Sequence, residues 1–141
     1  MSRQPIFLAA KSLATQVVIV MQNFPKAYKY TFGEALQRSA VRVMRDIGAA
    51  MYHTDPLDRL RAVEDFQADF EELKGLLDIS FERGWLTVKQ YASFAPSVES
   101  IGRQSSAWGR KLRERVGQSR QDNGSQQAGQ GGRPRPTWNG R

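Results

Sequence analysis

Apolar residues recur at alternating intervals of three and four positions in four segments of residues 1–115. This spacing places them on one face of an α-helix, so the sequence predicts four amphipathic helices, whose apolar faces we call seams. In chain order the seams are Ile6, Ala10, Leu13, Val17, Val20 and Phe24; Leu36, Ala40, Val43, Ile47 and Ala50; Leu60, Val63, Phe66, Phe70, Leu73, Leu77 and Phe81; and Tyr91, Phe94, Val98, Ile101, Ser105, Trp108 and Leu112.

Residues with strong positional preferences set the expected helix ends. Thr31 precedes the second seam and Glu34 follows three positions later, which predicts a capping box at the start of that helix. The third helix is predicted to begin at Pro56 and to end at Gly84, because proline suits a first turn and glycine suits the position after a last turn. Pro96 interrupts the fourth pattern and predicts either a kink or a new helix start.

Four helices joined by short loops predict an all-α fold, an up-down-up-down four-helix bundle that spans residues 1–115. Residues 116–141 are rich in glycine, glutamine and arginine, and after Val116 their only apolar residues besides glycine and proline are Ala128 and Trp138. So little apolar surface cannot offset the entropy lost on ordering. We therefore predict that residues 116–141 form a disordered tail.

Further apolar residues widen the seams beyond what one small bundle needs. They are Ile19, Met21, Met44, Met51, Leu57, Leu76 and Ile79. Some of these side chains are therefore expected to face other subunits of a homo-oligomer.

Composition excludes several classes of site, because the 141-residue chain contains no cysteine and a single histidine. Thiol nucleophiles, disulfides and cysteine-ligated zinc are excluded, and one histidine cannot build a multi-histidine metal centre. The apolar runs are too short for a membrane span, and the start lacks the pattern of a cleaved export signal. We therefore expect a cytoplasmic protein that holds no metal or cofactor.

Lysine and arginine outnumber aspartate and glutamate by 21 to 14, which gives a formal net charge of +7. Some of these cations recur on one face of the second and fourth predicted helices, and others alternate with Tyr28 and Tyr30. The candidate nucleic-acid-binding residues are Lys26, Lys29, Arg38, Arg42, Arg45, Arg103, Arg110 and Arg113. Rows of arginine can contact successive phosphates, and tyrosines can stack on bases. The alternative, a solvated surface and a plain helix connection, stays open.

The third predicted helix is acidic, and it lies between basic ones in the sequence. Opposite charges on neighbouring helices favour ion pairs within the bundle or between subunits. Asp65 and Asp69 share a helix face, but the Glu-x-x-His pattern of di-metal bundles does not occur.

A ribonuclease of the HEPN class is the enzymatic alternative. Such enzymes place an arginine and a histidine close together on one helix, whereas Arg45 and His53 are separated by seven residues. General acid–base chemistry also needs a second titrating group nearby, and no motif supplies one. We therefore expect no catalytic residues.

Three stretches of the chain resemble one family of small four-helix bundles. They are residues 24–36 (FPKAYKYTFGEAL), 85–91 (WLTVKQY) and 101–108 (IGRQSSAW). Over about residues 6–113 the chain resembles the family that contains the accessory variability determinant (Avd) of diversity-generating retroelements and the 23S ribosomal-RNA intervening-sequence proteins of bacteria.

The resemblance implies a ring-shaped homopentamer of bundles that binds RNA or DNA with little sequence preference. It also implies that a reverse transcriptase is a partner, engaged during mutagenic reverse transcription and retrohoming. The intervening-sequence proteins supply the alternative, a structural or RNA-associated bundle that works without a reverse transcriptase.

Overall fold

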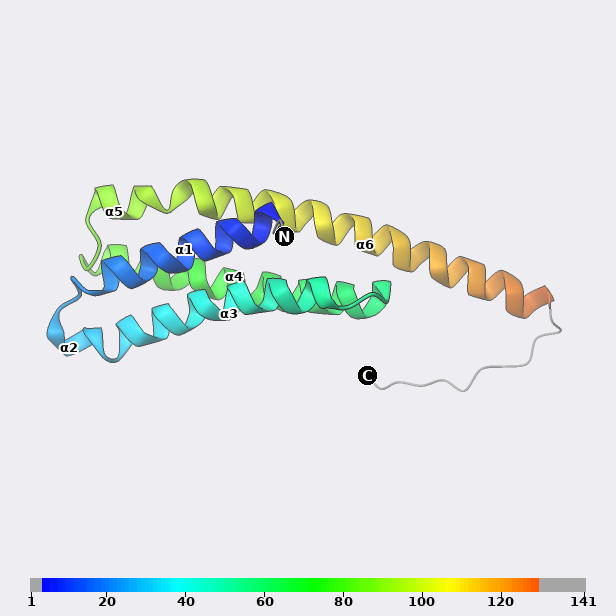
Figure 1. The fold of residues 1–141 in the computed structure, drawn as a ribbon, viewed down its shortest axis with the longest axis horizontal. Helices are drawn as coiled ribbons and strands as arrows, with labels where there is room; N and C mark the ends of the chain where they lie inside the picture. Colours follow the sequence, from blue (N-terminus) through cyan, green and yellow to red (C-terminus); the bar gives the residue numbers. More distant parts are fainter. Residues whose placement is uncertain (1–3, 130–141) are drawn as a thin grey trace.

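Six helical segments follow one another in the computed structural model, which describes residues 4–129 and the side chains of residues 4–122 (Figure 1). They are α1 (Pro5–Met21), α2 (Lys26–Lys29), α3 (Phe32–Tyr52), α4 (Pro56–Glu82), α5 (Val88–Ser93) and α6 (Ala95–Gly129). Residues 4–129 contain no strand. The all-α prediction is confirmed.

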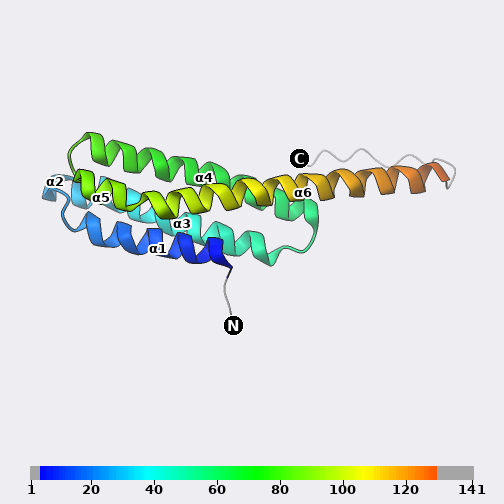
Figure 2. The ribbon, with the colours of Figure 1, turned by 90° about the horizontal axis from the view of Figure 1, so that it is seen from above.

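The four long helices α1, α3, α4 and α6 run up and down in alternation (Figures 1 and 2). Helix α3 packs against α1 and α4, and α6 packs against the same two helices. Helices α3 and α6 therefore occupy opposite corners of the bundle. The short connections between the helices enforce this antiparallel order, as the sequence predicted.

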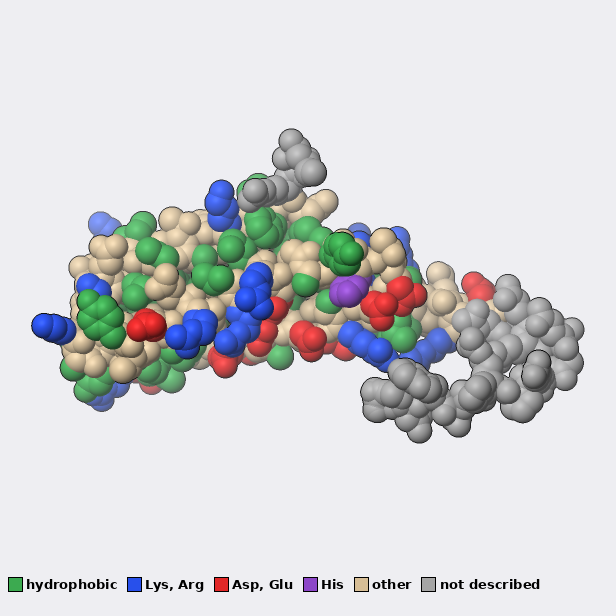
Figure 3. Space-filling view, turned by 60° about the horizontal axis from the view of Figure 1, so that its bottom comes forward, with side chains coloured by type: hydrophobic (Ala, Val, Ile, Leu, Met, Phe, Trp, Pro, Cys, Tyr) green, Lys and Arg blue, Asp and Glu red, His purple; other side chains and the backbone are tan. Residues whose placement is uncertain are grey.

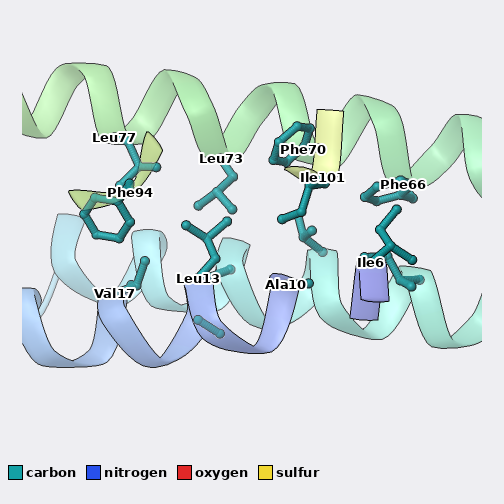
Figure 4. Packing of buried hydrophobic residues seen from close by; sticks show 14 of the residues in the cluster. Ile6, Ala10, Leu13, Val17, Phe66, Phe70, Leu73, Leu77, Phe94 and Ile101 are labelled. Atoms are coloured by element: carbon teal, nitrogen blue, oxygen red, sulfur yellow. The ribbon is translucent and has the colours of Figure 1, made fainter. Parts of the chain in front are cut away.

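The predicted seams meet in one core. Every seam residue of the first two predicted helices is buried, as are those of the third from Leu60 to Leu77. Figure 4 shows α4 side chains pointing toward α1, with side chains of the fourth seam beside them. The labelled residues are Phe66, Phe70, Leu73 and Leu77 of α4, Ile6, Ala10, Leu13 and Val17 of α1, and Phe94 and Ile101. Removing this apolar surface from water is the main force that holds the helices together.

The capping box predicted at Thr31 is wrong. Thr31 is the N-cap of α3, but its hydroxyl donates to the Tyr28 carbonyl (3.4 Å) and accepts no bond from the helix. A side-chain cap needs extended backbone, whereas Thr31 has φ −115° and ψ −79° because α2 leads directly into α3. A capping box forms instead at Thr87, which exchanges two bonds of 3.0 and 2.9 Å with Gln90.

The predicted bounds of the third helix are confirmed. Asp55 is the N-cap of α4 and Pro56 is its first residue. At the other end Gly84 adopts the left-handed conformation with φ 79°. This turn lets the Trp85 N–H donate to the Ser80 carbonyl at 2.9 Å, which closes the helix with a Schellman motif.

Pro96 divides the predicted fourth helix in two. Helix α5 ends at Ser93, and α6 begins at Ala95 with Pro96 in its first turn, where a missing N–H is tolerated. Phe94 is buried at the break, and the Gln16 side chain of α1 donates to the Ser93 carbonyl at 3.1 Å. Of the two alternatives, a new helix start is confirmed.

In the described residues the fourth long helix passes the predicted boundary between the bundle and a disordered tail at residue 115. Val116 is buried in the core, and α6 continues as a helix to Gly129, past the turn that joins α3 to α4 (Figure 2). The polar composition of residues 117–129 carries no apolar period, so the pattern could not show this extension. A helix that is already nucleated in the bundle can extend one residue at a time. Residues 130–141 of the predicted tail lie outside the described part of the chain.

Candidate nucleic-acid interface

The arginines predicted to form a stripe on the second helix lie along α3. Arg38 and Arg45 are exposed, and Arg38 lies 3.7 Å from the Glu34 carboxylate on the same helix. Arg42 instead reaches α4, where its Nη1 donates to Glu72 Oε1 at 2.8 Å. Of the three predicted phosphate-binding groups, Arg42 is therefore the one whose ion pair joins two helices of the bundle.

The second arginine set lies on α6, at the opposite corner of the bundle. Arg103 and Arg110 are exposed, whereas Arg113 Nη1 lies 3.8 Å from Glu64 Oε2 on α4. The acidic helix α4 thus packs against both the helix of the α3 set and the helix of the α6 set. Figure 3 shows one face on which acidic and basic side chains are interspersed. The ion pairing within the bundle, predicted as one of two possibilities, is confirmed at Glu72 and Glu64.

Lys26 and Lys29 lie at one end of the bundle in α2, a single helical turn where the sequence predicted a loop. The Tyr28 ring packs on Trp85, with 4.8 Å between ring centres, so this tyrosine joins two parts of the bundle. Tyr30 is 64% exposed, and Lys29 Nζ lies 5.9 Å from the centre of its ring. Tyr28 is 41% exposed, so Tyr30 is the more open of the two rings to a ligand.

A pair of carboxyl groups, Asp46 and Asp69, lies between α3 and α4, near Arg42 and Arg45 of α3. Asp46 Oδ2 is buried and lacks a hydrogen-bond partner when the group is a carboxylate. Burial, a hydrogen bond to Asp69 and repulsion from its charge raise the pKa of Asp46 to about 7, although Arg45 and Arg42 oppose the rise. Near neutral pH Asp46 is therefore protonated in a large fraction of the molecules, and its protonated carboxyl group can donate to Asp69. The pair forms only through the α3–α4 contact, so no spacing along the chain predicts it.

A further group of cations, which was not among the predicted binding residues, lies beside Trp108. Arg59 of α4 and Lys111 and Arg115 of α6 line two adjoining hollows together with Trp108, of about 530 and 370 Å³. We call these hollows the Trp108 groove. Trp108, Lys111 and Arg115 are spaced i, i+3 and i+7, which places them on one helix face. That spacing can be recognised in the sequence. The position of Arg59 beside Trp108 cannot, because it depends on how α4 packs against α6.

His53 caps the C-terminus of α3, and its ring contacts the Tyr52 ring with 6.0 Å between centres. Arg45 lies about two helical turns earlier on α3. In residues 4–122 no three histidine, aspartate or glutamate side chains are placed to hold a metal ion. None of the described helices has both the length and the apolarity of a membrane span.

A model of the bAvd-like family matches residues 2–112 of the chain. The chain belongs to the bAvd-like family. This confirms the resemblance drawn from the sequence, and it makes the chain an Avd-type accessory protein of a family that is in general non-catalytic. The bAvd-like match covers the bundle as far as Leu112 and stops before the extension of α6. No curated protein matches the chain.

Proposed function

We propose that this bAvd-like protein is a non-enzymatic accessory subunit of a diversity-generating retroelement. In this role it binds the RNA or DNA of the element and the reverse transcriptase, and it supports mutagenic reverse transcription and retrohoming in the cytoplasm. The observation that carries the proposal is the bAvd-like match over residues 2–112.

Exposed cations support binding of nucleic acid. Arg38 and Arg45 on α3 and Arg103 and Arg110 on α6 are open to solvent, and Lys26 lies exposed at the α2 end. Contacts from such side chains to phosphates do not depend on base sequence, and each one releases counterions. The proposed binding is therefore tolerant of sequence and sensitive to salt.

Exposed apolar residues support assembly with copies of the same chain. Several of them lie on the adjacent helices α1 and α3, and Figure 3 shows apolar side chains gathered in a band on one face. The residues of this α1–α3 face are Leu8, Val18 and Ile19 of α1 and Val41 and Tyr52 of α3. Exposed apolar side chains of this kind favour association, which removes them from water. A ring of five copies is what the resemblance implies.

The partner is tested by a pull-down of the tagged protein from its native host, with and without nuclease. We expect a reverse transcriptase that stays bound after nuclease treatment, together with one dominant structured RNA. Ribosomal RNA, or RNA of many kinds, without any polymerase would contradict the proposal and favour the intervening-sequence alternative.

The arginines are tested by changing Arg38→Glu and Arg45→Glu together while keeping Arg42, because its bond to Glu72 belongs to the bundle. Binding of a labelled nucleic acid should weaken about tenfold or more, and the slope of log K against log salt should become shallower by about 2. Fluorescence anisotropy measures both quantities, and circular dichroism checks that helicity is kept.

The matched control changes Arg61→Glu and Lys89→Glu, which are exposed and alter the net charge equally. An equal loss of binding in both double variants would show that net charge, and not the α3 arginines, holds the nucleic acid.

A further inference from the structure

The Trp108 groove arises where one helix of the bundle begins late. Helix α1 begins at Pro5, short of the turn that joins α3 to α4, whereas α6 continues alongside α4 (Figures 1 and 2). Trp108 packs against the core near this end but stays only partly buried. The groove is lined by Gln4 and Ile6 at the start of α1, Met51 of α3 and Trp108 of α6. An aromatic ring is thus left within reach of solvent in a concave site.

Positive charge surrounds this ring. Arg59, Lys111 and Arg115 line the groove, and Glu114 is the carboxylate among its lining residues. The N-terminal end of α1 also borders the groove, and its first turn carries no acidic residue to offset the positive end of the helix dipole. The groove therefore suits an anionic ligand that also has an aromatic part.

Arg59 is held in place for such a ligand. Its Nε donates to the Ala50 carbonyl at 3.2 Å, and its Nη2 donates to the Met51 carbonyl at 3.1 Å. These bonds use two of the five N–H groups of a guanidinium, and its charge is permanent. The side chain is therefore ordered before binding and keeps donors for a phosphate.

We propose that the Trp108 groove binds a nucleotide of a single-stranded nucleic acid, with its base stacked on Trp108 and its phosphates held by Arg59, Lys111 and Arg115. This inference rests on the proposed nucleic-acid-binding function and adds a site and a strand preference to it. A base in a single strand is free to stack on an aromatic side chain, whereas bases in a duplex are stacked on each other and paired.

The test compares a fluorescein-labelled oligo(dT) strand with a labelled duplex of the same length at one salt concentration. Trp108→Leu keeps an apolar side chain against the core but removes the ring. Its affinity for oligo(dT) should fall about tenfold, as expected for the loss of one stacked base, while its affinity for the duplex stays within about twofold. Trp108→Phe should restore part of the lost affinity. Unchanged binding of oligo(dT), or an equal loss on both probes, would overturn the inference.

The cations are tested separately by changing Lys111→Glu and Arg115→Glu together. This variant should lose more affinity for oligo(dT) than the control Arg61→Glu with Lys89→Glu, which has the same net charge and lies outside the groove. Equal losses in the two variants would contradict a local role of Lys111 and Arg115.

A measurement on the unaltered protein covers the case in which Trp108→Leu does not fold. Oligo(dT) carrying 5-bromodeoxyuridine is crosslinked by ultraviolet light, and the modified peptide is identified by mass spectrometry. An adduct within residues 104–115 is expected, and adducts confined to other segments would overturn the inference.

If neither oligo(dT) nor duplex binds in a salt-sensitive way, the proposed nucleic-acid binding itself fails. If both bind but Trp108 has no effect, only the groove assignment fails.

Discussion

Asp46 shows at the scale of one residue how a tertiary contact changes chemistry. In the folded chain its pKa is about 7, compared with an ordinary value of 3.8, because its half-buried carboxyl group lies beside Asp69. Between these two pH values the folded state binds more protons than the unfolded state. The free energy of unfolding therefore falls as the pH rises through this range, and above it the two carboxylates repel each other.

Asp46→Asn should remove this penalty, because an amide can still donate a hydrogen bond to Asp69 and carries no charge. We expect the melting temperature of the variant to exceed that of the wild type by a few degrees above pH 7, and the difference to vanish near pH 4. Thermal unfolding followed by circular dichroism over this pH range measures it. Asp65→Asn, at an exposed position of α4, is the control and should follow the wild-type pH dependence. If the melting temperatures of Asp46→Asn and the wild type differed by the same amount at every pH, the raised pKa of Asp46 would be contradicted.

At the scale of the element, the helix ends depend on backbone geometry as much as on residue type. Thr31 and Thr87 are both N-caps, and each has a residue capable of completing a capping box three positions later. Only Thr87 has the extended backbone that lets its hydroxyl accept an N–H bond, because a loop precedes α5 while α2 precedes α3 directly.

Thr87→Ala should therefore lower the free energy of unfolding by about 1 kcal/mol, whereas Thr31→Ala should change it by less than about 0.5 kcal/mol. Urea denaturation of the two variants measures the difference. Equal effects would contradict the prediction that the capping bond of Thr87 adds stability that Thr31 does not supply.

At the scale of the whole molecule, the arrangement of the four long helices places ion pairs and exposed apolar side chains on different surfaces. Helix α4 pairs its acidic residues with Arg42 of α3 and Arg113 of α6, which places salt bridges on that side of the bundle. The α1–α3 face instead exposes apolar side chains, including Ile19 at 61% and Tyr52 at 83%. The two isoleucines first suggested as subunit contacts, Ile19 and Ile79, both prove exposed, but they lie on different helices.

Under the proposed self-assembly, Ile19→Glu should shift the protein toward a monomer, because it places a charge within the α1–α3 face. Ile79→Glu makes the same change on α4 and should leave the oligomer intact. Light scattering coupled to gel filtration measures the mass of each variant. Dissociation by Ile79→Glu, or an unchanged mass for Ile19→Glu, would contradict assembly through this face.

Sequence alone determined the all-α class, the four seams and both ends of α4, because these follow from spacing along the chain. A period of three and four residues fixes which side chains share a helix face, and Pro56 and Gly84 act on their own backbone. The sequence also contains the stretches that resemble the bAvd-like family, and the match over residues 2–112 confirms this resemblance.

Tertiary structure decided the properties that depend on which helix lies beside which. The chain pattern placed Arg42 and Arg113 among the free phosphate-binding groups, and only the packing of α4 against both helices revealed their carboxylate partners. In the same way, Asp46 and Asp69 meet across the α3–α4 contact, and Arg59 comes to line the Trp108 groove where α1 begins late. Charge and burial act through space, so residues far apart in the chain become one site only when the bundle brings them together.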